Sequence, residues 1–348
     1  MVLHSIRVAG WSAALVTIFA LSACGPASED AKQEKDKASA STSAPSEETS
    51  PTAPERRERA EMLEEYEAAL EEARKTSGDG DPALWTLSDE DTTIHLFGTV
   101  HILRPDLEWR TEAFNEAFEE ADTLVLEVDM ESDEGQRAVM QDFMQRGLYG
   151  DGRTLSGQLS ESDLNVLENA IEPLGIPIAA LDPMEPWMVA VNLSVMKLQQ
   201  EGFDPNAGVE QVLIGEAQAD GKDFMFLETA SVQADIFDTL PEDEQKTFLY
   251  ETALTLDDST VMLDQVVEEW ADGDVEGLGT LVANPDTGGG EGIYDALFIE
   301  RNENWVPQIE AMLDEPGTFF VAVGAGHLAG PDSVITMLRD EGYEVEGP

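Results

Sequence analysis

The chain of 348 residues contains a single cysteine, Cys24, and only four histidines. One cysteine excludes an internal disulfide and leaves no second thiol for paired thiol chemistry. The sequence also lacks a phosphate-binding loop, a dinucleotide-binding glycine fingerprint and the nucleophile elbow of serine hydrolases. No fixed-period repeat occurs. These absences leave the scarce histidines and the abundant carboxylates as the residues available for chemistry.

Basic residues are also scarce, because 19 lysines and arginines stand against 73 acidic residues, a formal net charge of −54. A surface this negative repels nucleic acid and anionic headgroups, so we expect no nucleic-acid partner. The acids are spread along the chain rather than clustered. We therefore interpret them as adaptation to a salty exterior, not as a dedicated docking surface.

Residues 1–23 have the pattern of an export signal, with His4 and Arg7 before an apolar stretch over residues 8–21. That stretch is short for a membrane span. Leu21-Ser22-Ala23-Cys24 resembles the bacterial lipoprotein signal, in which the cysteine becomes the lipidated N-terminus. We expect a protein anchored to the cell envelope through lipid on Cys24, on the extracytoplasmic side. An ordinary secretory signal and a short membrane anchor are the alternatives.

Composition divides the rest of the chain into three parts. Residues 24–54 are rich in Ser, Ala, Thr, Pro, Glu and Lys without aromatics, which predicts a disordered tether. Residues 55–80 predict a charged helix and linker. The apolar stripe expected on that helix consists of Met62, Leu63, Tyr66 and Leu70. Residues 81–348 form the predicted folded domain.

Short apolar runs alternate with helical patterns in this domain, which predicts an α/β fold. We expect a mixed, partly parallel central sheet flanked by helices, with its first two strands forming a hairpin. The expected strands are residues 85–87, 92–97, 123–126, 176–181, 224–227, 318–323 and 343–345. The expected helices are residues 107–121, 187–200, 294–313 and 331–341, with helical segments from 231 to 281 and a glycine-rich loop over 284–291.

Two of the histidines occur in the same setting, Gly98-x-x-His101 and Gly324-x-x-His327, each after an apolar strand-like run. Glycine tolerates positive φ, so each strand is expected to turn sharply at its glycine. Each histidine would then lie just beyond the carboxyl end of its strand. Ligands bind at that edge in open α/β sheets. These strand–Gly-x-x-His–helix units near both ends of the domain predict one shared site.

Three carboxylates also follow apolar runs at the point where each run ends, namely Glu127, Asp182 and Glu228. If the strands are parallel, all three line the same edge as the two motif histidines. Asp182 precedes Pro183, which is typical of a turn, so we rank it below the two glutamates. His95 lies inside a strand and is expected to be structural.

This set of side chains suits a divalent metal ion, since a catalytic centre offers about three protein ligands and one position for water. His101, His327 and a glutamate, Glu127 or Glu228, would supply the ligands. The other glutamate would act as general base or orient a ligand. Without a metal, the same set could work as a histidine–glutamate acid–base pair. Arg301 could neutralise a buried carboxylate, hold a substrate carboxylate, or form a surface ion pair.

From residue 84 onward the chain resembles the TraB/GumN family, which is related to the Tiki membrane-associated proteases. The resemblance rests on both Gly-x-x-His motifs and on the order and spacing of further short stretches. These stretches are Leu84-Trp85, Asp122 to Glu127, Ala180-Leu181-Asp182-Pro183, Pro186-Trp187, Gly202-Phe203-Asp204-Pro205, Gly208-Val209-Glu210, Leu227-Glu228-Thr229 and Arg301-Asn302.

The resemblance implies an α/β fold and, for Tiki-like members, metal-dependent proteolysis. It places His101, His327 and Glu127 at the metal, with Glu228 and Arg301 in close support. Two positions depart from the family pattern. Glu210 stands where aspartate is common, and Gly326 stands where a bulky residue is common, which we expect to loosen the second turn.

Together these patterns predict a lipid-anchored extracytoplasmic metal-dependent hydrolase, in particular a peptidase acting on a peptide or protein substrate. The alternative from another functional class is a non-catalytic lipoprotein that holds a metal ion or haem in the same cleft.

Overall fold

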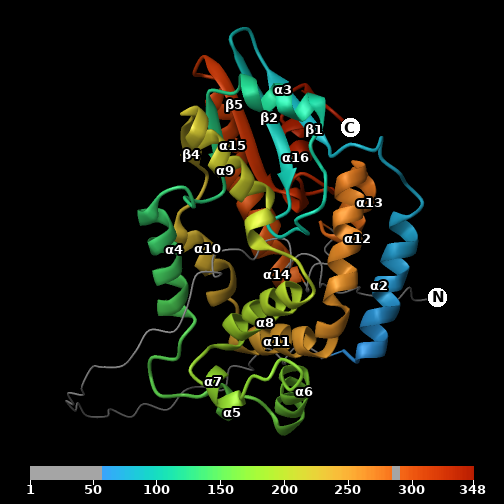
Figure 1. Cartoon of the computed structure of the whole chain (residues 1–348), viewed down its shortest axis with the longest axis vertical. Coiled ribbons are helices and arrows are strands. Elements are labelled where there is room, and N and C mark those ends of the chain that lie inside the picture. Colours follow the sequence, from blue (N-terminus) through green and yellow to red (C-terminus); the bar gives the residue numbers. More distant parts are fainter. Residues whose placement is uncertain (1–56, 284–290) are drawn as a thin grey trace, which may run out of the picture.

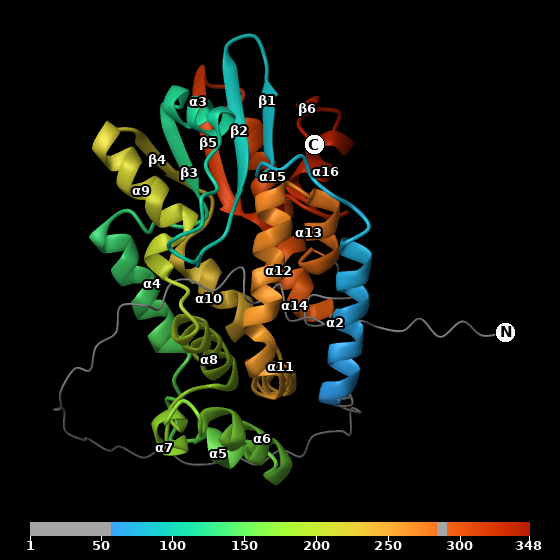
Figure 2. The same cartoon turned by 45° about the vertical axis from the view of Figure 1, so that its right-hand side comes forward.

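The computed structural model describes residues 57–283 and 291–348. The predicted export signal, Cys24, the tether and most of the glycine-rich loop lie outside the described residues. One sheet occupies one end of the molecule, and helices α5 to α8 and α11 occupy the other (Figures 1 and 2). The strands are β1 Leu84–Ser88, β2 Thr92–Thr99, β3 Thr123–Leu126, β4 Asp223–Phe226, β5 Gly317–Gly324 and β6 Val345–Glu346.

Helices make up most of the remaining described chain. Before the fourth strand they are α2 Arg59–Ala73, α3 Glu112–Glu120, α4 Asp133–Arg146, α5 Leu155–Gln158, α6 Glu161–Ile171, α7 Ile178–Leu181, α8 Pro186–Gln200 and α9 Val209–Asp220. After it they are α10 Ala230–Asp238, α11 Glu242–Thr255, α12 Ser259–Asp272, α13 Val275–Leu281, α14 Glu291–Tyr294, α15 Glu300–Met312 and α16 Val334–Asp340. Across the described ranges, none of these helices combines the length and apolarity needed to cross a membrane.

The strand order in the sheet is β4-β3-β5-β2-β1-β6. The four strands β4, β3, β5 and β2 are parallel, whereas β1 pairs antiparallel with both β2 and β6. The predicted mixed, partly parallel sheet and its entering hairpin are confirmed. Parallel strands all end at the same edge of a sheet, so the carboxyl ends of these four strands lie together.

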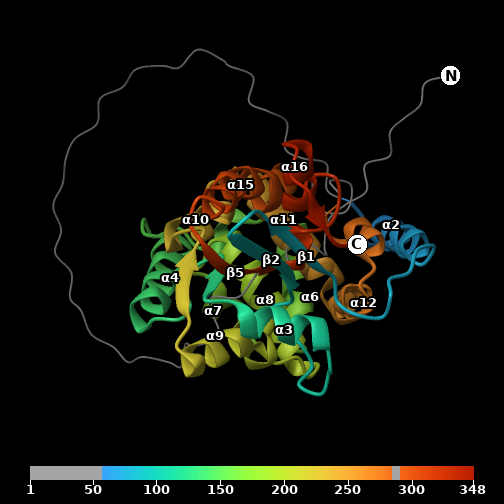
Figure 3. The ribbon, with the colours of Figure 1, turned by 90° about the horizontal axis from the view of Figure 1, so that it is seen from above.

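Side chains of the central strands alternate between two hydrophobic layers, as the period of a β-strand requires. Val125 and Val321 face the layer under α15 and α16, while Leu124 and Phe320 face the layer under α3. Seen from above, α15 and α16 cover one face of the sheet and α3 and α9 lie on the other (Figure 3). Phe114, Ala117 and Phe118 of α3, and Ala121 directly after it, are buried.

The strand predicted over residues 176–181 is wrong, because the segment forms the short helix α7 Ile178–Leu181. It lies at the end of the molecule far from the sheet, so no strand is available to pair with it (Figure 1). Ala179 and Ala180 are exposed and alanine favours helix. A short apolar run does not by itself distinguish a strand from a helix.

Helix boundaries differ from the predictions where a capping side chain sets the first turn. Thr111 accepts a hydrogen bond from the Phe114 amide, so α3 begins at Glu112 rather than at residue 107. Ser333 caps α16 in the same way, and that helix begins at Val334 rather than at 331. The predicted helix over residues 294–313 is interrupted by a π-helical turn, Asp295–Ile299. The last strand is residues 345–346, not 343–345.

The charged helix α2 is confirmed, but its buried face is not the predicted stripe. Met62 is buried together with Glu65, Ala69 and Ala73, while Leu63, Tyr66 and Leu70 are half-buried. Arg57 explains the buried acid, because its guanidinium contacts Glu65 at 3.0 Å and Glu251 of α11 at 2.8 Å. A buried carboxylate is tolerated when it is paired in this way.

Candidate functional site

The two Gly-x-x-His turns lie side by side, because β2 and β5 pair in parallel with Thr99 opposite Gly324. Neither motif glycine is among the positive-φ glycines of the described chain, so the expected left-handed turn is wrong. Close packing is the reason for glycine here. A β-carbon on Gly98 would lie 2.9 Å from the Ala325 Cα, closer than such atoms approach. The first motif therefore packs directly against the second.

Three predicted site residues converge around Gly324. A β-carbon at this position would lie 3.2 Å from Glu127 Oε1, 3.5 Å from His327 Cδ2 and 3.6 Å from His101 Nε2. The structure thus brings both motif histidines and Glu127 into one cluster at the carboxyl edge of the sheet, as their strand-end positions predicted.

Arg301, on α15, lies at the inner end of this cluster and uses all five of its N–H groups. Nε donates to Glu228 Oε1 (2.7 Å), and Nη2 donates to Glu127 Oε2 (2.5 Å) and to Glu228 Oε2 (3.1 Å). Nη1 donates to the Leu297 carbonyl (3.2 Å) and to His327 Nε2 (2.9 Å). Arg301 therefore neutralises buried carboxylates, which was one of the three roles predicted for it. With no N–H left over, it has none to offer a substrate carboxylate.

Glu228 reaches the cluster from the chain that leaves β4, and both of its carboxylate oxygens accept hydrogen bonds from Arg301. Besides the guanidinium, it accepts hydrogen bonds from Trp305 Nε1 (2.8 Å) and Gln233 Nε2 (2.6 Å). Asp182, the other ranked carboxylate, follows α7 far from the sheet. It stands in a turn, as expected, and its side chain accepts from the Ser156 amide at 3.0 Å.

Glu127 is held as a carboxylate anion. Its Oε1 accepts the Gly324 amide hydrogen at 2.7 Å, and its Oε2 accepts from Arg301. Burial raises the pKa of the Glu127 carboxyl, but the Arg301 charge and the Gly324 amide outweigh burial, so that pKa lies well below its usual range. A carboxylate this weakly basic is a poor general base and serves better as a fixed negative charge.

His327 is neutral, and its neighbours determine which ring nitrogen carries the hydrogen. Arg301 can only donate, so Nε2 must accept. Nδ1 then carries the hydrogen and donates to Asn302 Oδ1 at 2.7 Å. Burial, followed by the Arg301 charge, lowers the pKa of His327 well below its ordinary value. The ring centroid also lies 4.3 Å from that of Trp305, so His327 is fixed on all sides.

His101 is paired with Glu210, a residue that the sequence had marked only as a departure from the family pattern. The Nδ1 atom of His101 contacts Glu210 Oε1, and Thr99 Oγ1 donates to the same oxygen. Burial lowers the pKa of His101, but the Glu210 carboxylate and, more weakly, Glu127 outweigh burial and raise it above the ordinary value. This pairing leaves Nε2 directed toward Glu127 and Gly324.

Contacts between α9 and the first turn place Glu210 beside His101. The Val209 amide donates to the Val100 carbonyl at 3.1 Å, which joins the start of α9 to the first motif. Gly208 allows that approach, because a β-carbon there would lie 2.1 Å from the His101 carbonyl oxygen. Trp270 Nε1 of α12 donates to the Gly98 carbonyl at 2.8 Å. No strand-end pattern could reveal Glu210, because it lies in the first turn of a helix.

Exposure decreases from one end of the cluster to the other. The side chains of His101 and Glu210 are 11% and 15% exposed, whereas those of Arg301 and Glu228 are 3% and 4% exposed. His327 is buried completely. A reactant arriving from solvent would therefore meet His101 and Glu210 first, with Arg301 and Glu228 as the supporting interior.

The histidine and carboxylate side chains of this cluster are types that bind divalent metals, but their arrangement does not suit a metal ion. Of the three expected ligands, Glu127 and His327 already accept hydrogen bonds from Arg301. Over residues 57–283 and 291–348, no group of three or more histidine, cysteine or carboxylate side chains is arranged to hold a metal ion. The predicted metal centre therefore does not fit the arrangement that the structure shows.

The second turn is closely packed, so the expected loosening at Gly326 is wrong. A β-carbon on Gly326 would lie 2.7 Å from Phe298 Cε1 and 2.8 Å from Val282 Cγ1. Gly326 is therefore required by the neighbours it has in this chain. His95 is structural as expected, since its Nδ1 is 3.1 Å from Thr86 Oγ1 on the adjacent strand.

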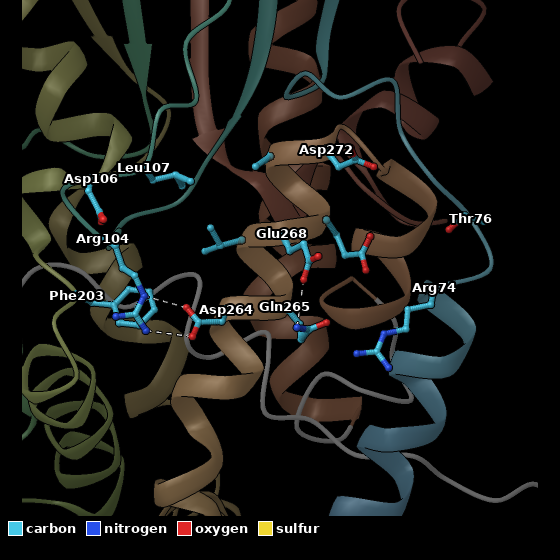
Figure 4. A pocket seen from close by; sticks show the side chains of 13 residues that line it. Arg74, Thr76, Arg104, Asp106, Leu107, Phe203, Asp264, Gln265, Glu268 and Asp272 are labelled. Atoms are coloured by element: carbon cyan, nitrogen blue, oxygen red, sulfur yellow. Dashed lines mark hydrogen bonds and ion pairs between the residues drawn. The ribbon is translucent and has the colours of Figure 1, made fainter.

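A separate pocket of about 830 Å³ lies between the end of α2 and α12 (Figure 4). Arg74 borders it on one side, and Arg104, paired with Asp264 at 3.0 Å and placed over Phe203, borders it on the other. Its lining contains none of the cluster residues and no histidine. This pocket is therefore distinct from the candidate site.

Comparison with known proteins gives both whole-domain and local similarity. The TraB/PrgY/gumN family model matches residues 83–347. The uncharacterized protein YbaP of Escherichia coli is 25% identical over 246 residues, which cover 71% of this chain and 88% of YbaP. A Treponema pallidum protein is 23% identical over 270 residues, which cover 73% of this chain and 79% of that protein.

Similarity to Tiki proteins covers a shorter stretch of the chain, at a higher sequence identity. The protein named Metalloprotease TIKI1 of Danio rerio is 52% identical over 52 residues, which cover 14% of this chain and 10% of TIKI1. No solved structure shows significant similarity to the chain.

Proposed function

Because the chain belongs to the TraB/PrgY/gumN family, we propose that it is a lipid-anchored extracytoplasmic hydrolase that cleaves peptide bonds at the His101 end of the cluster. The observation that carries this proposal is the His101–Glu210 pair, the most exposed part of an otherwise buried cluster of charged groups. The local similarity to proteins named metalloproteases supports peptide hydrolysis as the reaction class.

The proposed reaction uses the cluster as an acid–base device. His101 Nε2 takes a proton from water, and the water oxygen attacks the carbonyl carbon of the peptide. The proton on His101 then passes to the departing nitrogen, so the imidazole is restored. Glu210 keeps the Nδ1 hydrogen in place and orients the ring, as the third group of a catalytic triad does. The fixed charge of Glu127 stabilises the imidazolium that forms between the two steps.

The test is hydrolysis of a fluorogenic peptide library by the detergent-solubilised full chain. His101→Ala is expected to lower kcat/KM by about 10²–10⁴-fold, the usual contribution of a general base. His95→Gln is the matched control, because His95 lies on β2 outside the cluster, and its activity should stay at the wild-type value. Equal loss in both variants, or no hydrolysis of any peptide by the wild type, would refute the proposal and favour a binding lipoprotein.

Metal removal and pH separate the acid–base reaction from a metal-dependent one. We expect chelator to leave the hydrolysis rate unchanged. Activity should rise with pH through the raised pKa of His101, because the base must be unprotonated. Glu210→Gln should lower kcat and move this rise to lower pH, since Glu210 is what raises that pKa. Loss of activity with chelator and its return with added metal would contradict the acid–base mechanism.

The lipid anchor is the part of the proposal that concerns location. It is supported by Leu21-Ser22-Ala23-Cys24 after a short apolar stretch. Cys24→Ser removes the thiol that would carry lipid, so the protein is expected to leave the membrane fraction and appear as a soluble species. Fractionation of cells that express the wild type and the variant provides the measurement. A variant that stays in the membrane fraction would show that Cys24 is not the anchor.

A further inference from the structure

We infer that the Arg301 guanidinium takes the place of a metal cation in the cluster, and that a divalent metal binds there only when this side chain is absent or withdrawn. The inference concerns the cluster on which the proposed function rests. Its test measures metal binding rather than hydrolysis, so the two proposals can fail separately.

The contacts of Arg301 are those that a metal would need. Its Nη2 lies 2.5 Å from Glu127 Oε2 and its Nη1 lies 2.9 Å from His327 Nε2. A neutral imidazole has one free lone pair, and the one on His327 Nε2 already accepts a hydrogen from Arg301. A metal ion could bind this nitrogen only by displacing the guanidinium, which it would also repel.

Several neighbours lock the guanidinium in this position. Its Nη1 also donates to the Leu297 carbonyl, within the π-helical turn that directly precedes α15. The guanidinium carbon lies 4.7 Å from the ring centroid of Trp305, which is fully buried and also donates to Glu228. Arg301 itself is 3% exposed. These contacts distinguish it from a surface arginine that could swing aside at little cost.

Without the guanidinium, the remaining groups would match a metal site in type and number. Glu127 and His327 would each regain an atom that is free to bind a metal. His101 Nε2 already faces the same glycine, Gly324, as both of them. Two imidazoles and a carboxylate form a common ligand set for Zn²⁺ and Co²⁺. Glu228, close to the same point, would add a second negative charge that favours a divalent cation.

The test is Zn²⁺ and Co²⁺ binding to the full chain, measured by calorimetry and by the visible absorption of Co²⁺. We expect Arg301→Met to gain one equivalent of metal bound at least tenfold more tightly than any site of the wild type. The gain should disappear in Arg301→Met/Glu127→Gln. That difference isolates the cluster from weak binding to the acidic surface, which all variants share. Arg301→Lys retains the positive charge and should show no gain.

A second variant covers the case in which Arg301→Met does not fold. Arg301→Met/Glu228→Gln removes one positive and one negative charge together and keeps Glu127 and both histidines as ligands. It should show the same gain of metal. The inference is overturned if the wild type binds one equivalent as tightly as the variants and loses it on Glu127→Gln, or if neither folded variant gains metal. Neither result depends on whether the protein hydrolyses peptides.

Discussion

Arg301→Met is expected to lower the free energy of unfolding by about 3–5 kcal/mol, the usual cost of removing one partner from a buried ion pair. The reason is that Arg301 neutralises two carboxylates, Glu127 and Glu228, whose side chains are 8% and 4% exposed. Methionine has a similar length and fills part of the space, but it donates no hydrogen bond. Both carboxylates would then stay buried without their cation.

Urea unfolding of the wild type and the variant at one salt concentration is the measurement. Arg59→Met is the matched control, because Arg59 pairs with Asp258 at a site where their side chains are 47% and 29% exposed. Exposed pairs contribute about 1 kcal/mol or less. Adding Glu228→Gln to Arg301→Met should recover part of the loss. If Arg301→Met loses no more stability than Arg59→Met, the buried ion pairs of Arg301 do not stabilise the fold more than an exposed pair does.

Gly208→Ala should disturb the candidate site more than alanine at any other glycine near that site. Its β-carbon would lie 2.1 Å from the His101 carbonyl oxygen, which is backbone and has no rotamer to change. Either α9 or the first turn must therefore shift, and both carry a member of the His101–Glu210 pair. We expect a loss of about 1–3 kcal/mol in stability, as for overpacking in a core. We also expect up to about 10²-fold loss of peptide hydrolysis, the cost of a misplaced catalytic group.

Gly215→Ala, within α9, is the control for this substitution, because a β-carbon at Gly215 has nothing within 4 Å. Replacing a helical glycine with alanine should leave stability unchanged or raise it by up to about 1 kcal/mol. Urea unfolding and hydrolysis of one peptide substrate would compare the two variants. Equal stability and activity in Gly208→Ala and Gly215→Ala would show that the contact between α9 and the first turn is not critical.

Predictions made from the strand pattern succeeded where the sheet itself imposes the geometry. The apolar runs before Glu127, Glu228 and both motif histidines form parallel strands. The four residues follow directly after these strands or in the turns at their ends. A parallel sheet places all its carboxyl ends at one edge, so a polar residue just after each strand reaches the same place. That rule brought four of the expected site residues together without any knowledge of side-chain contacts.

The same reasoning failed where it depended on an isolated segment. Residues 176–181 have the composition of a buried strand, yet they lie beyond the reach of the sheet and form a helical turn. The motif glycines were expected to supply positive φ, but their role is to let two backbones approach. Both outcomes depend on what lies next to the segment in space, which local composition does not contain.

The amino-acid sequence was sufficient to place His101, Glu127, Glu228 and His327 at a common edge, because strand period and parallel pairing are local and repetitive. Only the tertiary structure paired Glu210 with His101 and brought Arg301 to the inner end of the cluster. Glu210 lies on α9, far along the chain from the β2 turn that carries His101, and Arg301 lies on α15, far along the chain from Glu127 after β3. Their partners therefore depend on how the helices pack on the sheet. That packing places the Arg301 guanidinium against Glu127 and His327, where the sequence predicted a metal ion.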